Sequence, residues 1–146
     1  MTEQYEEYRE AYDRHACLET LCKETAAELT KVIADATTGL SMMKEECKIT
    51  GKEISDAGQT ILMIESLSEL QTCSFKDAQL SIKTATLGMA KLCLFMKVET
   101  SQEDVAEAQE ELTKGIWYAN QASKEVQALR ALFKDEVAAL YELLKL

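Results

Sequence analysis

Proline is absent from this chain of 146 residues, and glycine occurs only five times. Proline breaks the interior of a helix because its ring clashes with the preceding turn and because it lacks a backbone N–H. Its absence therefore permits very long helices. Glu, Ala, Leu and Lys are abundant, which is typical of coiled coils. The composition favours an all-α protein.

Histidine is almost as scarce, because His15 is the single one in the chain. One histidine without a supporting motif cannot supply a serine or cysteine catalytic triad. The five glycines are isolated from one another, so the sequence contains no glycine-rich phosphate loop. We therefore expect a protein that is not an enzyme and that binds no cofactor.

Positive charge is in deficit, with 16 Lys and Arg against 26 Asp and Glu and a formal net charge of −10. Nucleic acids and anionic lipid surfaces attract cationic proteins, so we expect no nucleic-acid partner and regard a membrane partner as unfavourable. Apolar runs are at most five residues long, as in 92–96, whereas a membrane-spanning helix needs roughly 20. The sequence therefore predicts no conventional membrane span.

The first ten residues are acidic and polar, unlike a secretory or transit segment. Five cysteines form an odd set with no CxxC pair: Cys17, Cys22, Cys47, Cys73 and Cys93. Free thiols in a reducing compartment explain this usage most simply. We therefore expect a cytoplasmic protein.

Apolar residues recur at alternating spacings of three and four along nearly the whole chain, as on a helix with one apolar seam. The first run is Tyr5, Tyr8, Tyr12, His15, Glu19, Cys22, Ala26, Leu29, Ile33, Ala36, Leu40, Met43 and Cys47. The second is Ile54, Ala57, Ile61, Ile64, Ser68, Gln71, Phe75, Ala78, Ile82, Ala85, Met89, Leu92 and Met96. The third is Val105, Ala108, Leu112, Gly115, Ala119, Ala122, Val126, Leu129, Phe133, Glu136, Leu140 and Leu143. Each run predicts a long amphipathic helix.

Helix starts are marked by hydroxyl residues that precede an acidic residue by three positions, the pattern of an N-terminal cap. The candidate pairs are Thr50 with Glu53, then either Thr100 with Glu103 or Ser101 with Asp104. Together with the seams, these caps predict helices near residues 3–48, 52–98 and 102–145.

We predict a single domain over residues 1–146, an elongated up-down-up bundle of three long, coiled-coil-like helices. The short connections force neighbouring helices to run antiparallel. The middle seam falters at Ser68 and Gln71, where Leu67 and Leu70 lie one position earlier. The alternative is a four-helix bundle in which the middle helix breaks near residues 71–74.

One polar cluster interrupts the first seam, where His15, Glu19 and Cys22 occupy successive positions with Cys17 close by. Imidazole, carboxylate and thiolate groups all bind zinc, so a metal site is one interpretation. The other is a polar layer that fixes helix register, with Cys22 acting as a small apolar residue. We prefer the polar layer, because zinc sites usually draw ligands from several segments, and we expect no metal.

Acidic residues gather at the starts of the first and third predicted helices. They are Glu3, Glu6, Glu7, Glu10 and Asp13, then Glu99, Glu103, Asp104, Glu107, Glu110 and Glu111. Carboxylates near a helix N-terminus oppose the positive end of the helix dipole, which explains them without a partner. The alternative is an acidic end that binds a basic partner segment.

A second apolar face distinguishes this chain from a generic bundle. Leu80, Leu87 and Leu94 recur every seven residues on the side opposite the middle seam, and Trp117 lies opposite the third seam beside Ile116 and Tyr118. A helix that is apolar on two sides should be buried on both. We expect these four residues, Leu80, Leu87, Leu94 and Trp117, to border a surface for a protein partner or a second copy.

The sequence therefore predicts a non-enzymatic helical adaptor, scaffold or complex subunit that acts through protein–protein interaction. The alternative is a helical protein that opens to bind lipid or membrane, as a carrier or pore-forming protein. Its basis is the apolar stretch over residues 87–98, and the acidic net charge opposes it.

Overall fold

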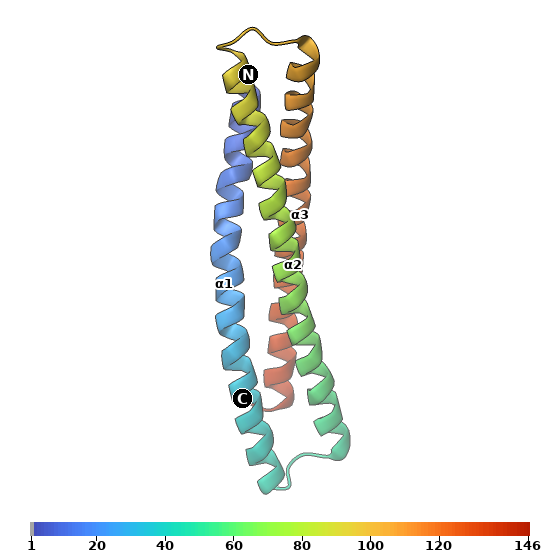
Figure 1. Ribbon diagram of the computed structural model, residues 1–146. Coiled ribbons are helices and arrows are strands. Elements are labelled where there is room, and N and C mark those ends of the chain that lie inside the picture. Colours follow the sequence, from blue (N-terminus) through green and yellow to red (C-terminus); the bar gives the residue numbers. More distant parts are fainter. Residues whose placement is uncertain (1) are drawn as a thin grey trace. The chain divides into compact units, whose positions relative to one another are not determined.

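The computed structural model describes residues 2–146 and consists of three α-helices, α1 (Thr2–Glu45), α2 (Gly51–Phe95) and α3 (Gln102–Leu143) (Figure 1). The described residues contain no strand. The protein is therefore an all-α three-helix bundle, as the sequence predicts. Because α2 continues without a break through residues 71–74, the four-helix alternative is wrong.

The chain divides into two compact units, each built from parts of all three helices. Unit 1 comprises Met1–Thr20 and Cys73–Val126, and unit 2 comprises Leu21–Thr72 and Gln127–Leu146. Each unit has its own cluster of buried apolar side chains.

Local capping bonds define where α2 and α3 begin. The Thr50 hydroxyl accepts a hydrogen bond from the Glu53 N–H at 3.2 Å, and the Ser101 hydroxyl accepts one from the Asp104 N–H at 3.2 Å. Both bonds satisfy a first-turn donor that has no partner within its own helix. Of the two candidate caps before α3, the structure uses Ser101, while the Thr100 hydroxyl donates to the Val98 carbonyl.

A left-handed residue ends α1. Cys47 has φ of 54°, and the Lys48 N–H donates to the Met43 carbonyl at 2.9 Å. This is the Schellman arrangement, which satisfies carbonyls that the last helical turn leaves without partners. Cys47 is exposed there, so the prediction that it extends the first seam is wrong.

In unit 1, α2 runs antiparallel to α1 and α3 (Figure 1). The Tyr8 hydroxyl lies 2.7 Å from the Thr86 hydroxyl, and the Lys91 ammonium lies 2.9 Å from the Glu111 carboxylate. The buried cluster is rich in small side chains: Ala11, Ile82, Ala85, Met89, Leu92, Ala108, Leu112, Ile116 and Ala119. Small residues let the helix backbones of this unit approach one another closely.

Two glycines mark the closest approach between α2 and α3 in unit 1. A Cβ atom on Gly88 would lie 2.7 Å from the Leu112 backbone nitrogen, and one on Gly115 would lie 2.6 Å from the Ala85 backbone nitrogen. Real Cβ atoms do not approach backbone this closely. The two helices therefore meet backbone to backbone at both points.

In unit 2, α1 and α3 run parallel and are joined by long-range hydrogen bonds. The Tyr141 hydroxyl donates to the Asp35 carboxylate at 3.0 Å, and Arg130 donates to the Thr25 hydroxyl at 2.8 Å. The buried cluster comprises Val32, Ala36, Met43, Ala57, Ile64, Leu67, Phe133, Val137, Leu140 and Leu144. Phe133 is the largest fully buried side chain, and the Arg130 guanidinium lies 5.6 Å from its ring centre.

Half of the predicted α1 seam is wrong by one position. Every second residue of the predicted run, the set that includes Tyr8, Ala36 and Met43, is buried or partly buried as predicted. The alternate positions are displaced, because Tyr5 and Tyr12 are 49% and 48% exposed. The residues one position earlier are buried instead: Ala11, Leu18, Thr25, Val32 and Gly39. Tyrosine covers apolar surface while keeping its hydroxyl in water, so a large ring does not by itself mark the seam.

The predicted α2 seam is confirmed up to Leu92, including its two polar members. Ser68 and Gln71 are buried, with exposures of 8% and 1%, and Leu70 points outward at 52%. Leu67, one position before Ser68, is buried as well, so the seam widens there but keeps its phase. Met96 is wrongly predicted, because α2 ends at Phe95 and leaves Met96 72% exposed.

The predicted α3 seam is confirmed up to Phe133. Beyond that residue the buried positions are Val137, Leu140 and Leu144. Glu136 and Leu143 were predicted in place of Val137 and Leu144, and both are only partly buried. Leu140 is buried as predicted, so only the alternate positions at the end of the α3 seam are displaced by one residue.

Gly115→Ala should lower the free energy of unfolding by about 1–3 kcal/mol, because the added methyl group forces the α2 and α3 backbones apart. Gly58→Ala is the matched control, since nothing lies within 4 Å of the added atom. It should raise the free energy by about 0.5–1 kcal/mol through helix propensity alone. Chemical denaturation of both variants checks this expectation, and equal stabilisation would contradict the close approach.

Candidate protein-interaction surface

The leucines that the sequence assigns to a second apolar face are exposed on α2 in unit 1. Leu80, Leu87 and Leu94 expose 66%, 52% and 55% of their areas. Ala78, Ala85 and Leu92, two residues before each of them, are buried with exposures of 0%, 0% and 5%. Two residues span about 200° around a helix, so the leucine row lies on the side opposite the core.

Trp117 is likewise exposed, at 56%, on α3 of the same unit. Its ring packs edge-on against that of Tyr118, with ring centres 4.9 Å apart and planes at 88°. Tyr118 is also 56% exposed, whereas Ile116 is buried and belongs to the core. The exposed aromatic surface of α3 is therefore the Trp117–Tyr118 pair.

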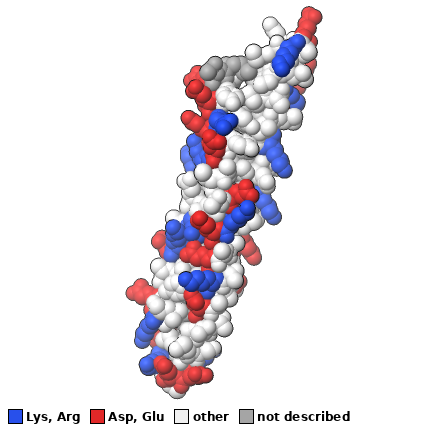
Figure 2. Space-filling model, turned by 90° about the vertical axis from the view of Figure 1, so that its left-hand side faces the viewer, with Lys and Arg blue, Asp and Glu red and all other residues white. Residues whose placement is uncertain are grey.

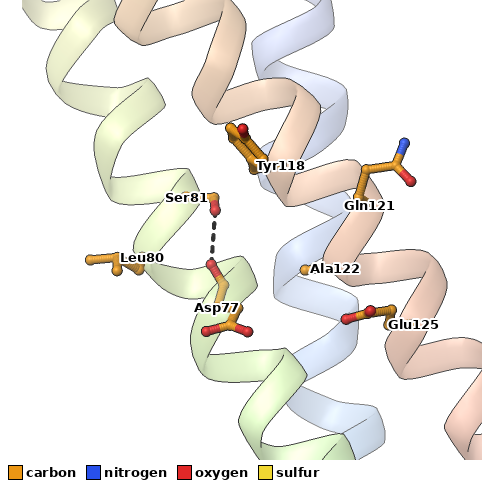
Figure 3. Close-up of a pocket in the computed structure, with 7 residues that line it drawn as sticks. All are labelled: Asp77, Leu80, Ser81, Tyr118, Gln121, Ala122 and Glu125. Carbon is orange, nitrogen blue, oxygen red and sulfur yellow. Dashed lines mark hydrogen bonds between the residues drawn. The ribbon is translucent and has the colours of Figure 1, made fainter.

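A groove of 340 Å³ separates α2 from α3 beside these residues (Figure 3). It is lined by Asp77, Leu80, Ser81, Tyr118, Gln121, Ala122 and Glu125. Figure 3 shows the Leu80 side chain projecting away from α3, so Leu80 forms the rim of the groove. Leu87 and Leu94 line no part of it. The structure thus brings Leu80 and Tyr118 to one groove. Trp117 contacts the Tyr118 ring but lines no part of the groove, and the other leucines continue along α2.

Ion pairs engage several of the acidic residues that open α1 and α3. Lys114 bonds Glu110 at 2.7 Å, Lys91 bonds Glu111 at 2.9 Å, and Arg9 lies 3.6 Å from Asp13. The hydrogen bond from Lys114 lowers the pKa of Glu110. Figure 2 shows acidic and basic side chains interleaved over the face that it displays. These pairs leave fewer carboxylates for a basic partner.

His15 stacks on an aromatic ring in unit 1. Its ring centre lies 5.0 Å from that of Phe75, with the planes 6° apart. Its Nδ1 atom has no hydrogen-bond partner among residues 2–146. Within this described part of the chain, no three His, Cys, Asp or Glu side chains converge to hold a metal ion.

Cys22 belongs to a separate buried polar layer, in unit 2. Burial raises the pKa of its thiol, and the neighbouring Gln71 side chain acts more weakly in the opposite direction. Arg130 reaches this layer from α3, where it bonds Thr25 and pairs with Glu28 at 2.9 Å. The amide of Gln71 makes no hydrogen bond of normal geometry within the described chain. This layer places polar side chains where a bundle core is usually apolar.

None of the helices formed by residues 2–146 contains an apolar stretch of the length that spans a bilayer. Comparison of the chain with protein-family models, curated proteins and solved structures found no match.

His15 should make the protein less stable as pH falls. Burial lowers its pKa below the ordinary value of 6.5, with Glu19 opposing this more weakly. As pH is lowered through 6.5, His15 takes up a proton in the unfolded chain but not yet in the folded chain. The free energy of unfolding therefore decreases as pH is lowered from about 6.5. The fall ends once pH drops below the folded pKa.

His15→Gln removes this titration and serves as the comparison. Chemical denaturation of both proteins near pH 7.5 and near pH 5.5 measures the difference, because the two chains differ only at residue 15. A steeper loss of stability in the original protein is expected. Parallel losses would show that His15 protonates as easily in the folded chain as in the unfolded one.

Proposed function

We propose that the protein is a non-enzymatic helical adaptor or complex subunit that binds other proteins through unit 1. One observation carries the proposal: Leu80, Leu87 and Leu94 are each more than half exposed, at seven-residue intervals, on a helix whose other side is already buried. Isolated exposed leucines are common on protein surfaces, but a heptad row is the pattern by which one helix packs against another.

The Trp117–Tyr118 pair supports the same proposal. Tryptophan and tyrosine are enriched among the residues that contribute most to binding at protein interfaces. Both rings are 56% exposed, and Tyr118 shares its groove with Leu80. A partner helix that covers the leucine row would therefore have an aromatic anchor within the same unit.

Lipid contact is a second candidate, favoured by the exposed apolar residues where α2 ends. Leu94, Met96 and Val98 expose 55%, 72% and 51% of their areas. The net charge of −10 opposes binding to anionic bilayers. Flotation with neutral liposomes separates this candidate from protein binding.

A photo-crosslinking amino acid placed at position 87 tests the adaptor proposal. Position 132 is the matched control, because Leu132 in α3 is exposed to the same extent, 52%. In extracts of the source cells we expect a discrete protein adduct from position 87 and none from position 132. The absence of an adduct from position 87, or equal labelling from both positions, would contradict the proposal.

Folding controls accompany this experiment. Leu87→Glu should change the free energy of unfolding by no more than about 0.5 kcal/mol, because the side chain is exposed. Leu112→Ala, at a position with 0% exposure, should cost about 2–5 kcal/mol. Chemical denaturation followed by circular dichroism checks both values and shows whether position 87 tolerates substitution without unfolding the protein.

A further inference from the structure

Lysines alternate with the exposed leucines along the outer side of α2 in unit 1. In chain order this face, termed the Leu/Lys face, reads Lys76, Leu80, Lys83, Leu87, Lys91 and Leu94. The spacings of three and four residues keep all six side chains within an arc of about 80° at 3.6 residues per turn. The leucines repeat every seven residues, as do Lys76 and Lys83, while Lys91 lies eight residues after Lys83. The face therefore resembles a coiled-coil seam with leucine at one heptad position and lysine near the other.

Two of the lysines form no ion pair within the described chain, although Glu19 of α1 lines the same groove as Lys83. Lys91 is engaged, because it donates to both carboxylate oxygens of Glu111 at 2.9 and 3.2 Å. Lys76 and Lys83 are exposed and form no ion pair with any residue from 2 to 146. Between residues 73 and 95 the one acidic residue is Asp77. Lysines therefore dominate the charge on this side of α2, whereas acidic residues of α1 and α3 line the grooves beside it.

A second copy of the chain does not suit this face. In a parallel pairing each leucine would meet a leucine and each lysine a lysine. In an antiparallel pairing centred on Leu87, Leu80 would meet Leu94, but Lys83 would meet Lys91 of the other copy. Both arrangements place like charges opposite each other at a desolvated seam, which disfavours pairing.

An anionic bilayer does not suit the face either. Three glutamates and one lysine, Glu107, Glu110, Glu111 and Lys114, line a groove beside Thr84, next to the leucine row, so acidic residues outnumber basic ones there. A flat bilayer that reached the lysines would also meet these carboxylates. The apolar row is one side chain wide, whereas helices that lie on membranes present a broad apolar side.

We propose that the Leu/Lys face binds an amphipathic helix of another protein that carries apolar residues and carboxylates at alternating heptad positions. Apolar side chains of the partner pack between Leu80, Leu87 and Leu94, and its carboxylates pair with Lys76 and Lys83. The alternation fixes the register and excludes basic helices, because a lysine opposite Lys83 would be repelled. This inference rests on the proposed function and adds the chemistry of the partner.

Two designed helical peptides of about 21 residues test this chemistry. The acidic peptide has Leu at one heptad seam position and Glu at the other, and the basic peptide has Lys in place of Glu. Each is labelled and titrated with the full chain while fluorescence anisotropy is followed. We expect the acidic peptide to bind at least about tenfold more tightly than the basic one, and less so as salt rises.

Variants of the chain identify the binding face. Lys83→Glu should lower the affinity for the acidic peptide by about tenfold and raise the affinity for the basic peptide. Lys134→Glu makes the same charge change at an exposed site in unit 2 and should leave both affinities within about twofold. Leu87→Ser should abolish binding of either peptide.

Three outcomes overturn the inference. The first is equal or tighter binding of the basic peptide. The second is binding of neither peptide. The third is sedimentation with phosphatidylserine vesicles that Lys83→Glu prevents, which would assign the face to lipid. In each case an adduct from position 87 in cell extracts would leave the proposed adaptor function standing, and the absence of that adduct would remove it as well.

Discussion

The approach of α2 to α3 in unit 1 depends on the absence of a side chain at Gly88 and Gly115. An atom added at either glycine would lie within 3 Å of the opposite backbone. Sliding or rotating α2 against α3 would move the glycines away from these contacts and bring residues with side chains into them. The side of α2 that faces the core is thereby fixed, with Ala85 and Leu92 buried. The Leu/Lys face is what remains on the outside, so its exposure follows from how the core packs.

The number of helices and their approximate bounds are recoverable from the sequence, because the signals for them are local. A missing proline, a seven-residue apolar period and hydroxyl caps at Thr50 and Ser101 are sufficient. The rotation of α1 is not recoverable in this way. Tyr12 and Ala11 are the two candidates for one seam position, and in the structure Ala11 is buried while Tyr12 is 48% exposed. The hydrophobic pattern favours the larger tyrosine ring for the buried position, whereas packing in three dimensions buries the smaller alanine.

The buried polar residues show the same limit. Ser68 and Gln71 suggested a shift in phase, because a seam read from hydrophobicity alone has no place for an amide. In the structure α2 keeps its phase and buries Gln71 at 1% exposure in a layer with Cys22. Such a layer costs stability and restricts how the helices align, as polar residues at coiled-coil seams do. Nothing in the sequence of α2 alone indicates which partners that layer would have.

The candidate surface was more predictable than the core that supports it. Leu80, Leu87, Leu94 and Trp117 follow from position opposite a seam, and all four are exposed. The groove at Tyr118 required the structure, because it depends on how α2 and α3 meet. The lysines of the Leu/Lys face are visible in the sequence at three- and four-residue spacings. Their significance emerges only when the exposed side of α2 is known.

Light scattering of the purified chain over a wide range of concentrations tests most directly whether the Leu/Lys face serves a different protein. We predict the mass of a single chain throughout, because the alternation of leucine and lysine disfavours pairing between copies. Leu87→Ser should leave that mass unchanged. A dimer that forms as concentration rises, and that Leu87→Ser dissociates, would contradict a face built for an acidic partner helix.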